Sequence, residues 1–222
     1  KIPRFNFDKF EGVDEELTTQ MKAVGEVMSI GRTFNESLQK AWQSLEIGYA
    51  GLGADRPDAD PETVRERLKA PRWDNLLHVR HAFRYGASVE EVHDVTEIDK
   101  WFLYQIQDLV ALEEEVRATP LREMDDRLLQ EVKRSGFSDE QIAFLVPEDV
   151  EDREVRAHRK DEDVTPAYQL VDTCAGEFPA ETPYYYSSYE TVNESTVTDR
   201  DKVLILGSGP NRIGQGIEFD YC

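Results

Sequence analysis

The sequence predicts a mainly α-helical domain flanked at both ends by partial α/β pieces. Three observations lead to this fold class. Residues 60–160 divide into short segments whose apolar side chains recur at helical spacing, each bounded by a capping residue, Gly or Pro. Residues 1–10 instead alternate as a strand does. Residues 203–206 form an unbroken apolar run, typical of a parallel strand covered on both faces.

The N-terminal stretch is predicted to contain one strand and two helices. Residues 1–10 form an edge strand for which the sequence shows no partner. Residues 16–30 carry apolar side chains at helical spacing and are predicted to form an amphipathic helix. Gly25 lies inside this helix, where it costs about 1 kcal/mol against alanine, so we expect a close packing contact there. A capping box of Thr33 and Glu36 starts the second helix.

A linker and then a series of helices follow. Residues 51–61 are rich in Gly, Asp and Pro, which indicates a linker and the first domain boundary. The predicted helices begin at Asp60, Asp74, Ser88, Thr96, Leu121, Ser138 and Asp149. The helix that begins at Thr96 is the longest, and its apolar stripe includes Phe102 and Ile106.

A near-repeat lies within this helical region. Residues 86–92 and 136–142 match at a spacing of fifty, and in each copy a helix ends at Gly and a Ser-capped helix follows. Two interpretations stay open: the recurrence of common capping residues by chance, or two stacked helical hairpins from one duplicated unit. DNA-reading helix-turn-helix motifs share this local pattern, but the charge of the chain excludes that interpretation.

Composition restricts the partners and the compartment. With 46 acidic and 26 basic residues, the net charge of -20 argues against nucleic acid or an anionic membrane as a partner. Only nine of the basic residues are Lys; this composition is typical of a salt-rich cytoplasm and equally of an ordinary acidic protein. Cys174 and Cys222 provide no disulfide framework. Neither a signal peptide nor a membrane-spanning run is evident, so we expect a cytoplasmic protein.

The C-terminal quarter is predicted to be extended. Pro179 and Pro183 exclude a helix, and residues 184–189 are rich in Tyr. Because so many aromatic side chains are costly to expose, we expect a strap that lies over the helical domain and the following sheet. Polar residues 193–198 mark the second boundary.

A glycine-rich loop with Gly207, Gly209 and Gly214 follows the apolar run, and its amides could face an anion. It is not the dinucleotide fingerprint, because Arg212 stands where the third Gly would lie. A nucleotide-dependent oxidoreductase is still one alternative. It would need an acidic residue about twenty positions beyond the glycines to hold a ribose. A stand-alone helical interaction module is a second alternative, but it leaves both ends unexplained.

No catalytic constellation is evident from the residues. His78 and His81 have a spacing that can bind a metal, but no third ligand of suitable spacing accompanies them, so we interpret them as a surface pair. Residues 113–115, three consecutive Glu, are interpreted as a solvated helix face. Cys174 is interpreted as a buried structural cysteine.

Three stretches resemble, in the same order, the large subunits of the carbamoyl phosphate synthetase family. They are residues 20–33 (QMKAVGEVMSIGRT), residues 171–178 (VDTCAGEF) and residues 206–222 (LGSGPNRIGQGIEFDYC). The third is the most specific, and the resemblance covers the whole chain.

The resemblance implies three domains. Residues 1–48 correspond to the end of the first ATP-grasp, or carboxyphosphate, unit. Residues 49–198 correspond to the all-helical oligomerisation domain with its extended strap. Residues 199–222 correspond to the first strand and glycine-rich loop of the pre-ATP-grasp domain of the second half.

The resemblance also implies an ATP-dependent carbon-nitrogen ligase. Such enzymes make carbamoyl phosphate from bicarbonate, two ATP and the ammonia that a glutaminase small subunit releases from glutamine, for pyrimidine and arginine synthesis. Full-length members use ATP with Mg or Mn and K. Nothing in residues 1–222 matches those ligands, so we expect this segment to bind none of them and to be inactive alone.

Two further expectations follow from the resemblance. Residues 50–165 should self-associate, as the family uses this domain to oligomerise. Glu26, Gly214 and Gly216 are candidates for lining the internal passage through which the reaction intermediate moves.

Overall fold

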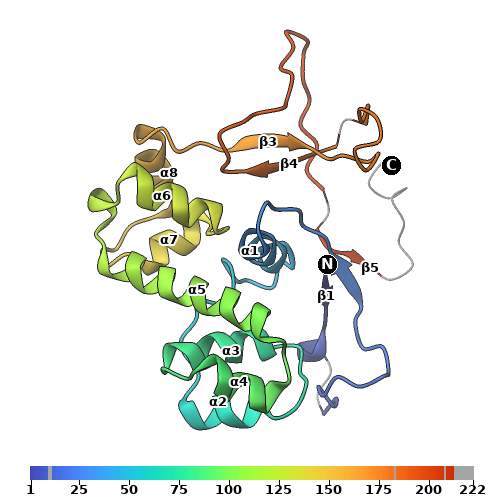
Figure 1. Ribbon diagram of the computed structural model, residues 1–222, viewed down its shortest axis with the longest axis vertical. Helices are drawn as coiled ribbons and strands as arrows, with labels where there is room; N and C mark the ends of the chain where they lie inside the picture. The colour runs from blue at the N-terminus through green and yellow to red at the C-terminus, as the bar shows by residue number, and fades with distance from the viewer. Residues whose placement is uncertain (10–11, 183, 208, 213–222) are drawn as a thin grey trace.

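The computed structural model describes residues 1–9, 12–182, 184–207 and 209–212. Most of them form a helical body, while a two-stranded hairpin lies along its upper edge and a small sheet containing the N-terminal strand lies at its right (Figure 1). The mainly helical fold class is therefore confirmed. In these ranges no helix is long and apolar enough to cross a membrane.

The described residues form eight α-helices: α1 Phe34–Ser44, α2 Pro61–Leu68, α3 Asn75–Arg84, α4 Val89–Thr96, α5 Lys100–Ala118, α6 Asp126–Arg134, α7 Asp139–Leu145 and α8 Asp152–Asp161. They also form five short strands and two 3-10 helices: β1 Ile2–Arg4, β2 Gly25–Val27, β3 Ala167–Leu170, β4 Tyr185–Ser188, β5 Asn211–Arg212, η1 Phe7–Lys9 and η2 Leu121–Glu123.

Side-chain caps explain where most helices begin. Four predicted caps accept a hydrogen bond from a backbone N–H in the first turn: Thr33, Asp60, Ser88 and Ser138. The capping box predicted for Thr33 is only half formed, because the Glu36 carboxylate accepts from the Arg32 N–H instead.

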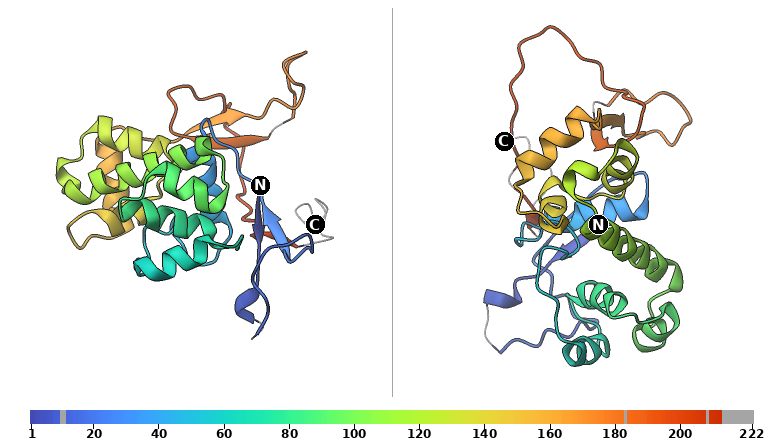
Figure 2. Two further views of the ribbon diagram at one scale, coloured as in Figure 1. Left: turned by 60° about the horizontal axis from the view of Figure 1, so that its bottom comes forward. Right: turned by 90° about the vertical axis from the view of Figure 1, so that its left-hand side faces the viewer.

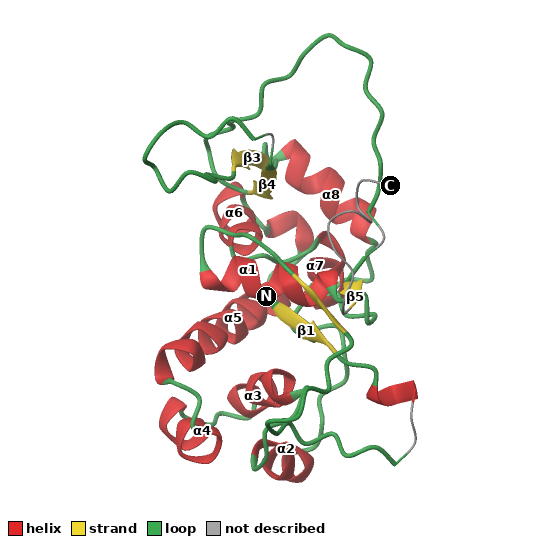
Figure 3. Ribbon diagram, turned by 90° about the vertical axis from the view of Figure 1, so that its right-hand side faces the viewer, coloured by secondary structure: helices red, strands yellow, loops and turns green. Residues whose placement is uncertain are grey.

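Helix α5 organises the body. It contacts α1, α3, α4 and α7, with α2 to α4 on one side and α6 to α8 on the other (Figures 1 and 3). Its inward face carries Leu103, Ile106 and Val116, each at most 1% exposed. Burying one such side chain contributes about 1.5–3 kcal/mol, so this face supplies much of the driving force for packing.

The predicted strap is present as a hairpin. Strands β3 and β4 pair antiparallel, with Ala167 opposite Ser188, and the hairpin lies beside the helices in both views of Figure 2. The ammonium of Lys40 on α1 donates to the Ser187 carbonyl at 2.6 Å and to the Ile30 carbonyl at 2.7 Å. Helix α1 therefore holds both the strap and the segment that follows β2.

The helix predicted for residues 16–30 is wrong. Part of that stretch is strand β2, which pairs antiparallel with β1 and so provides the partner that the edge strand lacked in the sequence. Gly25 and Val27 are buried on β2 while Met21 and Met28 are 72% and 69% exposed. Pairing between distant segments overrides a helical pattern that rests on few residues.

The linker predicted for residues 51–61 is partly wrong. Leu52 and Ala54 are 1% and 0% exposed, and the Leu52 N–H donates to the side chain of Gln39 on α1 at 2.7 Å. These residues form an ordered turn inside the core, because their polar backbone groups are hydrogen-bonded there.

Three predicted helix boundaries also change. The helix predicted from Asp149 begins at Asp152, directly after its N-cap residue Glu151. The longest helix begins after Asp99, whose side chain caps it, and not at Thr96, which ends α4. Phe102 is consequently 42% exposed rather than part of the buried stripe. The helix predicted from Leu121 is divided, because η2 ends before Asp125, whose side chain caps α6.

The two copies of the near-repeat have the predicted local structure. Gly86 and Gly136 end α3 and α6 with φ of 83° and 86°, and a Ser-capped helix follows each. They do not stack on each other, however, since α5 lies between them (Figure 3). The duplication itself stays an interpretation.

The apolar run of residues 203–206 is not a strand. These side chains are 82–90% exposed, because no described strand pairs with the run and a single strand cannot bury itself. The nearby strand is β5, which pairs antiparallel with β2. The helix predicted to follow lies outside the described residues.

Candidate functional site

The described residues contain no group of three or more His, Cys, Asp or Glu that could hold a metal ion. His78 and His81 are 8% and 7% exposed, so their interpretation as a surface pair is wrong. His78 lies 3.2 Å from the Asp74 carboxylate, and His81 lies 3.6 Å from that of Asp58. Cys174 is half-buried in the turn between β3 and β4, rather than buried as expected.

A buried ion pair joins α3 to α5. The Arg80 guanidinium is 0% exposed, and it donates to both carboxylate oxygens of Glu113 at 2.6–3.0 Å. Glu113 is 1% exposed, so the expected solvated face of residues 113–115 is wrong at this position. Burial raises the pKa of Glu113, whereas the hydrogen bonds from Arg80 favour its charged form.

Charged groups from three elements surround this pair. Asp58, from the turn before α2, accepts a hydrogen bond from Arg84, and Arg84 also donates to Glu114 at 3.1 Å. Burial, followed by the charge of Arg80, lowers the pKa of His81 to about 4, so its imidazole is neutral at pH 7. The cluster is consistent with a device that fixes how α3 and α5 pack.

A second charged cluster anchors the strap. Lys133 on α6 and Arg159 on α8 both donate to the Asp139 carboxylate, at 2.7 Å and 2.9 Å. The two cations also lie over the Tyr189 ring, 4.9 Å and 5.6 Å from its centroid. Burial raises the pKa of Tyr189 to about 12. Tyr189, the residue directly after β4, is thus held by two helices of the body, α6 and α8.

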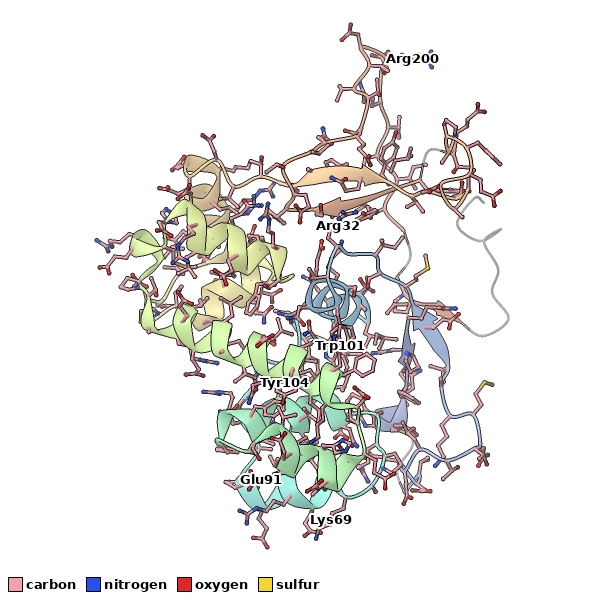
Figure 4. All side chains as sticks on the ribbon, in the orientation of Figure 1. Arg32, Lys69, Glu91, Trp101, Tyr104 and Arg200 are labelled. Atoms are coloured by element: carbon pink, nitrogen blue, oxygen red, sulfur yellow. The ribbon has the colours of Figure 1, made fainter. Side chains whose placement is uncertain are left out.

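An exposed aromatic face is the feature best suited to contact another protein. Phe34 packs against Trp101 and Phe102, with ring centroids 5.4 Å and 5.3 Å apart. Trp101 is 53% exposed, and Tyr104, one turn further on α5, is 47% exposed. Figure 4 shows both side chains at the same end of α5. We call Phe34, Trp101, Phe102 and Tyr104 the aromatic face.

Two of the stretches assigned to the passage meet in the three-stranded sheet. Glu26 lies on β2 directly opposite Asn211 of β5, and its carboxylate pairs with the Lys1 ammonium at the surface. The sheet therefore brings Glu26 to the glycine-rich loop, although the two are far apart in the sequence.

Only part of that loop can be placed. At Gly207 an added Cβ meets nothing within 4 Å, so the structure shows no steric need for Gly there. Gly209 has a φ of 86°, a backbone conformation that favours Gly, and it lies against the flexible Glu46 carboxylate. Gly214 and Gly216 lie outside the described residues.

Sequence reasoning missed both charged clusters, although a signal was present. Arg80 follows Leu77 by three positions on the inward face of α3, and Glu113 follows Leu109 by four on that of α5. Opposite charges at core positions of two helices are the expected signature of a buried pair.

The described residues define a helical domain with an exposed aromatic face, joined to short β pieces. Residues 26–163 match the family described as carbamoyl-phosphate synthetase large chain, oligomerisation domain. Residues 199–222 match the carbamoyl phosphate synthase preATP-grasp domain. The chain belongs to the carbamoyl phosphate synthase large chain family.

Individual relatives support this assignment over the full chain. The carbamoyl phosphate synthase large chain of Nostoc sp. is 54% identical over 224 residues, that of Pseudomonas aeruginosa 52% over 226, and that of Archaeoglobus fulgidus 50% over 228. Each match covers 100% of this chain but only 20% or 21% of the relative. The chain thus spans about a fifth of the length of these relatives.

Proposed function

We propose that this chain is the central, non-catalytic segment of a carbamoyl phosphate synthase large chain, which self-associates and links the two synthetase halves. The whole enzyme would be an ATP-dependent carbon-nitrogen ligase, working with a glutaminase small subunit, ATP, Mg or Mn, and K. Its product, carbamoyl phosphate, would serve pyrimidine and arginine synthesis in the cytoplasm. The family assignment replaces the oxidoreductase alternative, and relatives that carry this segment within a longer chain favour it over a stand-alone module.

The observation that carries the self-association proposal is the aromatic face, which lies in a domain whose family is described by oligomerisation. Contiguous exposed aromatic side chains are typical of protein contacts, and burying Trp and Tyr supplies a large part of the binding energy at such contacts. The residues involved belong mainly to α5, the helix that the rest of the body holds rigid. A two-fold contact between copies is the simplest closed arrangement.

The linking role rests on α1 and the strap. Lys40 bonds the segment that follows β2 and also the strap, and Tyr189 fixes the strap to α6 and α8. The division into residues 1–48, 49–198 and 199–222 stays part of this proposal, although the oligomerisation family model begins at residue 26. The sheet pairing of Glu26 supports its place on the passage together with the glycine-rich loop.

Sedimentation velocity over a concentration series in moderate salt tests self-association. The wild-type chain should form a dimer, and the W101S/Y104S variant should sediment as a monomer. The V197S variant, which alters an exposed residue outside residues 50–165, is the control and should behave as wild type. A wild-type monomer at high concentration would contradict self-association of this chain. A double variant that still dimerises would show that the contact lies in another part of the domain.

Calorimetry with ATP and Mg tests the non-catalytic assignment. The chain should show no ATP binding in the micromolar range and no ATP hydrolysis in response to bicarbonate. Micromolar binding would mean that nucleotide ligands lie within these residues after all.

A further inference from the structure

A large cavity lies between the N-terminal segment and the helical body. Its volume is about 1160 Å³, enough for a small-molecule ligand. The walls come from β1 and η1, the end of α1, the turn between α2 and α3, and the turn between α4 and α5 (Figure 1). Nothing in the proposed function uses this space.

Aromatic side chains line the cavity. Phe5 and Phe7 stack with ring centroids 5.3 Å apart and an interplanar angle of 12°. Trp42, Tyr49 and Trp73 belong to other parts of the wall. Flat walls of this kind favour a planar ring, which stacks on them and displaces water.

Three lining residues carry a buried hydrogen-bond donor without a hydrogen-bond partner among the described residues: Arg4, Trp42 and Arg72. Arg72 is nevertheless ion-paired to Glu15, so Arg4 and Trp42 carry the argument. Trp42 is only 3% exposed, yet its indole Nε1 has no acceptor among the described residues. The Nη1 atom of Arg4 is buried and equally unpartnered. A buried donor without an acceptor is costly, and an unpaired guanidinium more so, which points to an acceptor that the described side chains do not provide.

The other lining charges do not satisfy Arg4. Glu15 pairs with Arg67 and Arg72, whereas Glu46 and Glu97 are exposed to water. Among the described side chains, Arg4 therefore has no carboxylate within ion-pair distance. A guanidinium in a partly dry wall selects a carboxylate, which it can bind through two parallel hydrogen bonds.

We propose that this cavity is a binding site for a small planar aromatic carboxylate. The ring stacks between the aromatic walls, the carboxylate lies at Arg4, and the Trp42 N–H donates to an acceptor atom of the ligand. This site shares no residue with the aromatic face, so it stands or falls independently of the proposed self-association.

Calorimetry with three probes tests the chemistry of the ligand. Naphthalene-2-carboxylate should bind the wild-type chain. The neutral 2-naphthamide and the non-aromatic cyclohexanecarboxylate should each bind at least about tenfold more weakly, since each lacks one of the two features that the site recognises. Equal affinity for naphthalene-2-carboxylate and 2-naphthamide, or no binding of any probe, would overturn the proposal.

Variants test the assignment to Arg4. R4M should weaken naphthalene-2-carboxylate at least about tenfold while leaving 2-naphthamide unchanged, so that discrimination between the two is lost. R127M is the matched control, because Arg127 does not line the cavity and is an exposed arginine that pairs with Glu131. It should bind as wild type. Unchanged binding in R4M would show that the probe binds elsewhere.

Nuclear magnetic resonance of the three Trp indole N–H groups provides a readout that also reports folding. Naphthalene-2-carboxylate should shift the Trp42 signal, because its free N–H gains an acceptor. Trp101, which does not line the cavity, should not shift. A shift confined to Trp101 would place the ligand on the aromatic face and overturn the site.

Discussion

Arg80 and Glu113 place a full positive and a full negative charge in the core, where water cannot solvate either one. Their attraction offsets the loss of hydration only while the hydrogen-bonding geometry is kept. Asp58, His81 and Arg84 extend the same arrangement to the turn before α2. At this scale the charges determine which packing of α3 on α5 is acceptable, because a shifted packing leaves charges unpaired.

Removing one partner should therefore cost much more than its hydrogen bonds alone. We expect E113A to lower the free energy of unfolding by about 3–5 kcal/mol, since Arg80 is left buried with only the Asp58 carboxylate, 3.6 Å away, as an ion-pair partner. E115A, which alters an exposed carboxylate on the same helix, should change it by less than about 0.5 kcal/mol. Urea denaturation of both variants measures the difference. A small effect of E113A would show that water or another carboxylate reaches Arg80.

His81 should make stability depend on pH. Its folded pKa of about 4 lies below the ordinary value of 6.5, so the unfolded chain binds the extra proton first as pH falls. The contribution of neutral His81 to the free energy of unfolding is fully present above about pH 6.5 and is lost as pH decreases toward 4. Between pH 7 and pH 5 the free energy of unfolding should therefore decrease by about 1–2 kcal/mol less in the H81Q variant than in wild type.

Denaturation in urea at several pH values checks this difference between H81Q and wild type. Identical pH profiles would mean that His81 does not titrate abnormally, since the neighbouring Asp58, His78, Arg80 and Arg84 are present in both proteins.

At the scale of elements, the sequence predicts best what short-range hydrogen bonds decide. The caps at Asp60, Ser88 and Ser138 hold because a side chain bonds to its own first turn. Strand β2 could not be predicted, because its pairing with β1 involves a distant segment. The start of α5 was predicted wrongly at Thr96, because Thr96 belongs to the last turn of α4 and the Asp99 side chain caps α5 instead.

The two matched glycines provide a test of how α1 docks on the helical body. Gly86 and Gly136 have nearly the same φ, so alanine at either position carries a strain of about 1–2 kcal/mol. An added Cβ at Gly86 meets nothing within 4 Å, whereas one at Gly136 lies 2.9 Å from Gln39 Cβ and from backbone atoms of Glu36. G136A should therefore lower the free energy of unfolding by about 1–3 kcal/mol more than G86A does.

Urea denaturation of G86A and G136A measures this difference directly, because each variant serves as the control for the other. Equal costs would show that α1 shifts away from the turn between α6 and α7 without loss, and so does not dock tightly there.

At the scale of the whole molecule, the order of segments along the chain does not reveal which of them meet. The sheet joins Glu26 to Asn211, and Lys40 joins the segment after β2 to the strap. No sequence pattern marks either contact, since each depends on the complete fold. The predicted passage residues could thus be selected only by resemblance, and their role stays a prediction.

The net charge of -20 acts on the whole molecule as well. Carboxylates outnumber cations by 46 to 26, so many of them have no cation to pair with and repel one another in the folded state. Dissolved salt screens charges that are separated by more than about 8 Å at physiological ionic strength. Close ion pairs such as Arg80 and Glu113 are buried and are screened much less, so the stabilising contacts survive while the repulsion fades.

We therefore expect the melting temperature to rise steadily from low salt to molar KCl, by about 2–4 °C for each kcal/mol of repulsion that is screened. Calorimetric melting in KCl measures the rise, and sucrose, which adds no charge, separates screening from general stabilisation by solutes. A steady rise in KCl alone would favour an origin in a salt-rich cytoplasm. A flat curve would show that the acidic side chains are spaced widely enough to solvate independently, which leaves only the interpretation of an ordinary acidic protein.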